Sequence, residues 1–146
     1  MARTAQIQAA SLEVRRTIAA PRERVFQAFT RPEDVRQWSA PAPLSVAVAE
    51  IDLRVGGRFR IAMEQPDGGR HVATGEYREI TPPQRLVYTW SWDDKSVADS
   101  LITVEFQERG AATEVVLRHE QLPDATSAQR HTEGWNGCFD KLAAMF

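Results

Sequence analysis

The residues best suited to acid–base or metal chemistry in this chain are its three histidines, His71, His119 and His131. An imidazole titrates near neutral pH, so a histidine that faces a cavity can transfer a proton or orient a polar group of a ligand. The three lie on separate predicted elements without the spacing of a metal-binding motif, and we therefore expect no catalytic zinc and no cofactor. For His119 two roles stay open: a core histidine satisfied by a backbone group, or a contact to a ligand.

Other residues that could carry chemistry are better explained by structural roles. The single cysteine, Cys138, falls on an apolar helix stripe with no adjacent base, which indicates a buried thiol rather than a nucleophile. Arg16 points by alternation to the apolar side of a strand, where we favour a structural ion pair over ligand contact. Asp93, Asp94 and Asp99 gather in one loop at the predicted mouth of a cavity, and we expect solvated charge there. The sequence contains no nucleophile elbow, phosphate loop or dinucleotide motif.

The composition is that of an ordinary water-soluble protein. The chain has 146 residues, of which 42% are hydrophobic and 26% charged, and this excludes the disordered, collagenous and membrane classes. A net charge of -2 gives no sign of nucleic acid as a partner, and no apolar run is long enough for membrane insertion. We predict a loose leader over residues 1–10, a single domain over residues 11–146 and a cytoplasmic location.

The longest predicted helix closes the chain, over residues 124–146. Asp124 is suited to cap its start. Gly134 borders its apolar stripe and Gly137 lies opposite, and together they should lower helix stability by about 2 kcal/mol relative to alanine. We expect close packing at Gly134 and find no reason for Gly137. The apolar stripe recurs at steps of three and four and comprises His131, Trp135, Cys138, Phe139, Leu142 and Met145.

Alternation of apolar and polar residues predicts a sheet that occupies most of the chain. An initial strand over residues 11–18 is followed by a helix after Pro21 and by a second short helix, for which Thr30 to Glu33 has capping-box spacing. From residue 44 onward the period is two and turn residues separate the runs, which indicates an antiparallel meander rather than βαβ units. The six strands of this meander are predicted at residues 44–53, 58–64, 71–80, 85–92, 100–108 and 113–120.

The inner face of the predicted sheet combines small residues with large aromatic ones. Ala73 and Gly75 fill little volume, so either the closing helix approaches closely there or a cavity remains. A sheet that wraps a helix places its core and its cavity on the same face, and core aromatics then double as ligand contacts. The candidate ligand-binding residues are Trp38, Phe59, Met63, Tyr77, Tyr88, Trp90, Phe106, His119, Trp135 and Phe139.

Several segments occur in an order that resembles a known superfamily. They are residues 16–30 with Trp38, the Gly56-Gly57 pair before a strand, the stretch Gly75 to Leu86 (GEYREITPPQRL), the run Leu117 to His119, and the closing Gly134-Trp135. Together they resemble the START-like helix-grip (SRPBCC) superfamily, and more narrowly the branch named for the activator of the heat-shock protein 90 ATPase. The resemblance extends from about Leu12 to the C-terminus. Ser39, where many relatives carry a second tryptophan, and Cys138, where leucine is common, depart from the pattern and would alter the pocket more than the fold.

This resemblance implies an α+β helix-grip fold: strand, two helices, six strands and a long helix, with a seven-stranded antiparallel sheet around an internal cavity. It does not select one activity, because members of the superfamily serve different functions. The function we favour is non-covalent binding of a hydrophobic or aromatic small molecule. The alternatives are an enzyme of the polyketide cyclase or dehydratase type, with His119 and Tyr77 or Tyr88 moving protons, and a co-chaperone-like module with a protein partner. A homodimer also stays open.

Overall fold

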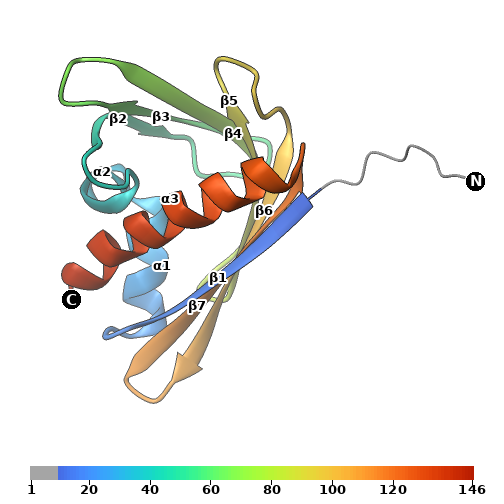
Figure 1. Ribbon diagram of the computed structural model, residues 1–146. Coiled ribbons are helices and arrows are strands. Elements are labelled where there is room, and N and C mark those ends of the chain that lie inside the picture. Colours follow the sequence, from blue (N-terminus) through green and yellow to red (C-terminus); the bar gives the residue numbers. More distant parts are fainter. Residues whose placement is uncertain (1–9) are drawn as a thin grey trace, which may run out of the picture.

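The computed structural model describes residues 10–146, which form a curved sheet with a long helix lying across its hollow side (Figure 1). The predicted leader therefore lies outside the described residues, except for Ala10, which begins the first strand. The elements are β1 (Ala10–Ile18), α1 (Arg22–Thr30), α2 (Pro32–Trp38), β2 (Ser45–Ile51), β3 (Arg58–Glu64), β4 (Arg70–Thr81), β5 (Arg85–Trp92), β6 (Ser100–Arg109), β7 (Ala112–Leu122) and α3 (Ala125–Ala144).

The seven strands form one antiparallel sheet in the order β1-β7-β6-β5-β4-β3-β2. The predicted helix-grip fold of the α+β class is confirmed. Consecutive strands from β2 to β7 pair with one another, as short turns between antiparallel strands dictate. The first strand, β1, pairs with the last strand, β7, and Ile18 lies opposite Thr113. This closing pair brings β1 under the long helix.

The terminal helix α3 begins and packs as its sequence predicts. The carboxylate of Asp124 accepts a hydrogen bond of 2.7 Å from the backbone N–H of Ser127, which caps the first turn. Its buried side chains are Trp135, Cys138, Phe139 and Leu142. The helix packs against β1, β7 and α2, so it leans toward one side of the sheet. Strands β3 to β5 on the other side are left with space between them and the helix.

The boundary between α1 and α2 differs from the prediction. Thr30 does not cap α2; it is the last residue of α1, and its hydroxyl donates a 3.0 Å hydrogen bond to the carbonyl of Phe26. The chain then turns at Arg31, and Pro32 starts α2, which has no side-chain cap. The capping-box interpretation was wrong because a threonine hydroxyl can satisfy a carbonyl of the preceding turn equally well.

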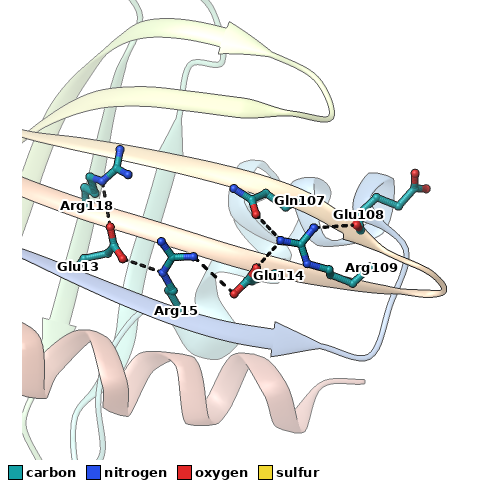
Figure 2. Close-up of polar contacts among 7 residues, drawn as sticks. All are labelled: Glu13, Arg15, Gln107, Glu108, Arg109, Glu114 and Arg118. Carbon is teal, nitrogen blue, oxygen red and sulfur yellow. Dashed lines mark hydrogen bonds and ion pairs between the residues drawn. The ribbon is translucent and has the colours of Figure 1, made fainter.

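Charged residues cover the outer faces of β1, β6 and β7, as Figure 2 shows. Glu13 accepts hydrogen bonds of 2.7 Å from Arg15 and 3.0 Å from Arg118, and these two cations lower the pKa of its carboxyl group. Glu114 lies 3.7 Å from Arg15 and 2.8 Å from Arg109, which extends the network across the sheet. Alternating charges of this kind keep β1, an edge strand, from pairing with other chains. No helix within residues 10–146 has the length and apolar character needed to cross a membrane.

Candidate functional site

A pocket of about 430 Å³ lies between α3 and the ends of β3, β4 and β5. Its apolar wall consists of Met63 from β3, Trp90 and Trp92 from β5, and Trp135 from α3. Pro41, Leu44, Gly134 and Cys138 complete the apolar lining. A volume of this size accommodates a small organic molecule of several rings.

The rim of the pocket is polar. Asp93, Asp94 and Ser96 come from the loop after β5, His71 comes from the start of β4, and Arg130 and His131 come from the first half of α3. The Asp94 carboxylate accepts hydrogen bonds from the backbone N–H and the hydroxyl of Ser96, which lower its pKa and keep it ionised. The predicted position of this acidic loop at the mouth of a cavity agrees with the lining of the pocket.

The two glycines of α3 have roles opposite to those predicted. Apart from its own helix, no atom of residues 10–146 would lie within 4 Å of a Cβ on Gly134, and Gly134 borders the open pocket. A Cβ on Gly137 would lie 2.7 Å from the Cβ of Pro41, closer than two such atoms can approach. Gly137 is therefore the residue that permits close packing, and Gly134 leaves space for something outside the protein.

The predicted cavity beside Gly75 is filled. A side chain at Gly75 would overlap both the ring of Phe59 and the backbone oxygen of Thr89. The small residue thus accommodates a large neighbour on the same face of the sheet, and neither a cavity nor the helix occupies this point. The expectation was wrong because alternation shows which face a residue is on, but not which neighbouring side chain leans over it.

The ten residues predicted to bind a ligand divide into three groups. Met63, Trp90 and Trp135 line the large pocket. A second pocket of about 30 Å³ has room for roughly one water molecule. Trp90 and Trp135, with ring centroids 5.2 Å apart, line both pockets and so form the partition between them. The other candidates on the small pocket are Trp38, Phe59, Tyr77 and Tyr88.

Phe106, Phe139 and His119 line neither pocket. Phe106 and Phe139 pack on Phe29, with ring centroids at 5.1 and 6.2 Å, in the core between α1, α3 and β6. His119 is fully buried. The structure therefore brings together some of the predicted residues at a pocket and assigns these three positions to the interior.

The side chain of His119 is held by hydrogen bonds on both ring nitrogens. The indole N–H of Trp135 donates to Nδ1 at 3.1 Å, and Nε2 lies 2.7 Å from the hydroxyl of Ser100. That hydroxyl donates its own proton to the carbonyl of Trp90 at 2.6 Å, so it accepts from His119, whose proton is on Nε2. A proton on Nδ1 would point at the indole N–H of Trp135, so two hydrogen-bond donors would face each other. Desolvation by burial is the main cause that lowers the pKa of His119 to about 3, and the neighbouring His131 lowers it further.

His131 and Trp92 form a second histidine–indole pair. The sequence did not predict His131 as a pocket residue. Its Nδ1 donates to the carbonyl of Ser127 at 2.7 Å, and its Nε2 accepts from the indole N–H of Trp92 at 2.9 Å. The two imidazole rings are 5.1 Å apart in an edge-to-face arrangement. The apolar stripe of α3 includes His131 and so indicates that this residue faces the sheet. No pattern in the sequence indicates its tryptophan partner.

Burial suppresses ionisation of the other groups near the pocket. Desolvation raises the pKa values of Tyr77 and Tyr88 and that of Cys138, the last to about 12. At neutral pH these phenols and this thiol are protonated, and His119 is neutral. The inner walls of the site carry no charge from any of them. Such walls bind by apolar contact and by neutral hydrogen bonds.

Two further predictions concern Arg16 and metal ions. Arg16 forms an ion pair with Asp140 of α3, with 3.0 Å between nitrogen and oxygen, and this is the structural role we favoured. Within the described part of the chain, no group of three histidine, cysteine, aspartate or glutamate side chains could hold a metal ion. The histidine nitrogens of the site are instead occupied by indole, hydroxyl and carbonyl partners.

A family model described as "Activator of Hsp90 ATPase homolog 1-like protein" matches residues 19–146. The chain belongs to this family. The match includes every element from α1 to α3 and hence all residues that line the two pockets. No curated protein is detectably similar in sequence.

Solved structures similar to this member of the Activator of Hsp90 ATPase homolog 1-like family come from several bacteria. The AHSA1 protein of Silicibacter pomeroyi is 30% identical, with a TM-score of 0.82 over 93% of this chain and 96% of that one. A protein of Chromobacterium violaceum is 28% identical, with a TM-score of 0.83 over 92% and 95%. An AHSA1-like protein of Aeromonas hydrophila is 25% identical, with a TM-score of 0.77 over 92% and 90%. These similarities support the fold over more than nine-tenths of the chain.

Proposed function

We propose that this protein binds a small hydrophobic or aromatic molecule in the pocket between α3 and strands β3 to β5. The observation that carries the proposal is a pocket of about 430 Å³ with three tryptophans in its wall. Aromatic side chains provide a large apolar contact area in a rigid form. Membership of the Activator of Hsp90 ATPase homolog 1-like family is consistent with this function.

Gly134 adds an independent argument. A glycine in the middle of a helix lowers its stability by about 1 kcal/mol relative to alanine. No described protein atom would contact a methyl group at this position, so packing within the protein does not require the glycine. A ligand that lies against the backbone of α3 does require it. The open space at Gly134 supports a ligand position between this glycine and the tryptophan wall.

The alternative of a cyclase-type enzyme is less well supported. It needs His119 to exchange a proton with a ligand, but both ring nitrogens of His119 have protein partners. His119 lines neither pocket, and Tyr77 and Tyr88 border only the small one. With the pKa of His119 near 3, the imidazole is a weak base at neutral pH. Non-covalent binding requires no proton transfer from these residues.

Filling the pocket from the helix tests the proposal. The probe is N-phenyl-1-naphthylamine, a neutral dye whose fluorescence rises in apolar surroundings. We expect saturable binding to the wild-type protein with one site per chain. Gly134→Leu adds a side chain directed into the pocket without lowering helix propensity, and it should weaken dye binding at least about tenfold, since the ligand and the leucine compete for one volume.

Glu133→Leu is the matched control, because it adds the same side chain to an exposed position next to Gly134 that does not line the pocket. This variant should bind the dye as the wild-type protein does. Urea unfolding of both variants shows whether the fold is retained. The proposal fails if the wild-type protein shows no saturable binding, or if a folded Gly134→Leu variant binds as tightly as Glu133→Leu.

A further inference from the structure

We infer that the ligand carries a hydrogen-bond acceptor that pairs with the indole N–H of Trp90, and that it is a neutral aromatic carbonyl compound. The inference rests on the proposed function and names the chemical class that the pocket selects. It follows from the hydrogen bonds of the tryptophans, from the atoms around Trp90, and from the charges at the rim.

Trp90 differs from the other three tryptophans of the chain in its indole N–H. Trp38 donates to the carbonyl of Ala28 at 2.8 Å, Trp92 donates to His131 at 2.9 Å, and Trp135 donates to His119 at 3.1 Å. Trp90 is 4% exposed, and its Nε1 has no partner within residues 10–146. A buried donor without an acceptor destabilises the folded protein by about 1–3 kcal/mol.

The described aromatic side chains around Trp90 have no free acceptor. Its ring lies 5.2 to 6.2 Å from the rings of Phe59, Trp92, Trp135 and His119. Phe59 has no polar atom, and both indole neighbours are donors. His119 is the one neighbour with a nitrogen lone pair, and Trp135 already occupies it. Trp90 lines both pockets, so a molecule in the large pocket would lie against its indole ring, and we infer that this molecule supplies the missing acceptor.

The charges at the rim select a neutral acceptor over an anionic one. Asp93 and Asp94 stand at the mouth, and hydrogen bonds from Ser96 keep Asp94 ionised. Arg130 offsets one of these two negative charges. The inner wall is apolar, and an anion beside Trp90 would lose its hydration there, because Arg130 is an exposed side chain at the rim. A carbonyl oxygen on an aromatic ring system satisfies the donor and leaves the rest of the ligand apolar.

A matched pair of ligands tests the inference. 1-Tetralone and tetralin share the same two-ring skeleton, and only the first has a carbonyl group. Their Kd values are measured for the wild-type protein and for Trp90→Phe, which keeps an aromatic ring and removes the N–H. In the variant, the Kd of tetralone should rise relative to the Kd of tetralin by about 5- to 100-fold. This range corresponds to the loss of one buried hydrogen bond. Comparing ratios removes the difference in water solubility between the ligands and the loss of ring area.

A second measurement on the wild-type protein does not depend on the variant folding. In a ¹⁵N-edited NMR spectrum, the Trp90 indole N–H resonance should move downfield with tetralone and much less with tetralin. The Trp38 resonance is the internal control, since its N–H is already bonded to Ala28 and it does not line the large pocket.

The outcomes separate the two proposals. If neither tetralone nor tetralin binds, and the dye does not bind either, the proposed function fails. If both bind and the Trp90 resonance does not move with tetralone, or the ratio of Kd values is unchanged in Trp90→Phe, the inference fails while the proposed function stands. A Trp90 N–H that is bonded to an ordered water in the free protein, and keeps that water when tetralone binds, also overturns the inference.

Discussion

The two glycines of α3 allow the same substitution to be made three residues apart with opposite expected effects. Gly134→Ala places a methyl group where, apart from the helix itself, no described atom lies within 4 Å. Its effect should equal the difference in helix propensity, a stabilisation of about 1 kcal/mol. For a chain of this length such a change raises Tm by roughly 3 °C.

Gly137→Ala gains the same helix propensity but must accommodate a Cβ that lies 2.7 Å from the Cβ of Pro41. That atom belongs to a proline ring and cannot rotate away, so either the loop or the helix has to shift. Overpacking of this kind costs about 1–3 kcal/mol, which leaves Gly137→Ala between neutral and about 2 kcal/mol less stable than the wild-type protein. The two variants should therefore differ by about 1–3 kcal/mol.

Urea unfolding followed by tryptophan fluorescence measures both variants, with the midpoint and the slope m fitted for each. Both substitutions remove one glycine from the unfolded chain, so the difference between them reports the folded state alone. Equal stabilisation by the two would refute the argument that Pro41 limits the space at Gly137. A Gly134→Ala variant less stable than the wild-type protein would refute the argument that the space at Gly134 is open.

Two further predictions concern the interior. His119 has a folded-state pKa of about 3, below its value near 6.5 in the unfolded chain, so the unfolded state takes up the proton first and stability falls as pH drops through this window. Between pH 7 and pH 5 this group should lower the free energy of unfolding by about 2 kcal/mol. Urea unfolding at both pH values should show that His119→Gln loses less free energy of unfolding than the wild-type protein. Equal losses in the two proteins would contradict the lowered pKa of His119. Gly75→Ala should lower the free energy of unfolding by about 3 kcal/mol or more, because its methyl group would overlap the Thr89 backbone and the Phe59 ring; a loss under about 1 kcal/mol in the same assay would show that β4 shifts freely.

The fold was predictable because its signals are local and repeated. The strands β3 and β5 begin and end at the predicted residues, since each is a period-two run bounded by turn residues. The cap at Asp124 combines a favourable residue type with the start of an apolar stripe. The start of α2 was misassigned because Thr30 has two hydrogen-bonding options, and only the packed structure decides between them.

The site was less predictable because it depends on contacts between distant segments. The sequence indicates that Trp90 and Trp135 face inward, but their place between two pockets depends on how α3 leans on the sheet. Pro41 belongs to an irregular loop, and its approach to Gly137 has no periodic signature. Small residues mark either a tight contact or an open space. At Gly75 and Gly134 the choice between these depended on one neighbour in each case, which the sequence does not identify.

The histidines of the site act by holding the walls of the pocket in place. His119 fixes the indole of Trp135, and His131 fixes the indole of Trp92, each through a nitrogen that must stay unprotonated to accept the bond. These two walls are thus set before a ligand enters, which lowers the entropy lost on binding. The indole N–H of Trp90, which lies between them, has no hydrogen-bond partner among residues 10–146. A site with two fixed walls and one unsatisfied donor favours a ligand that supplies an acceptor at that point, because an apolar ligand of the same shape would leave the donor buried and unpaired.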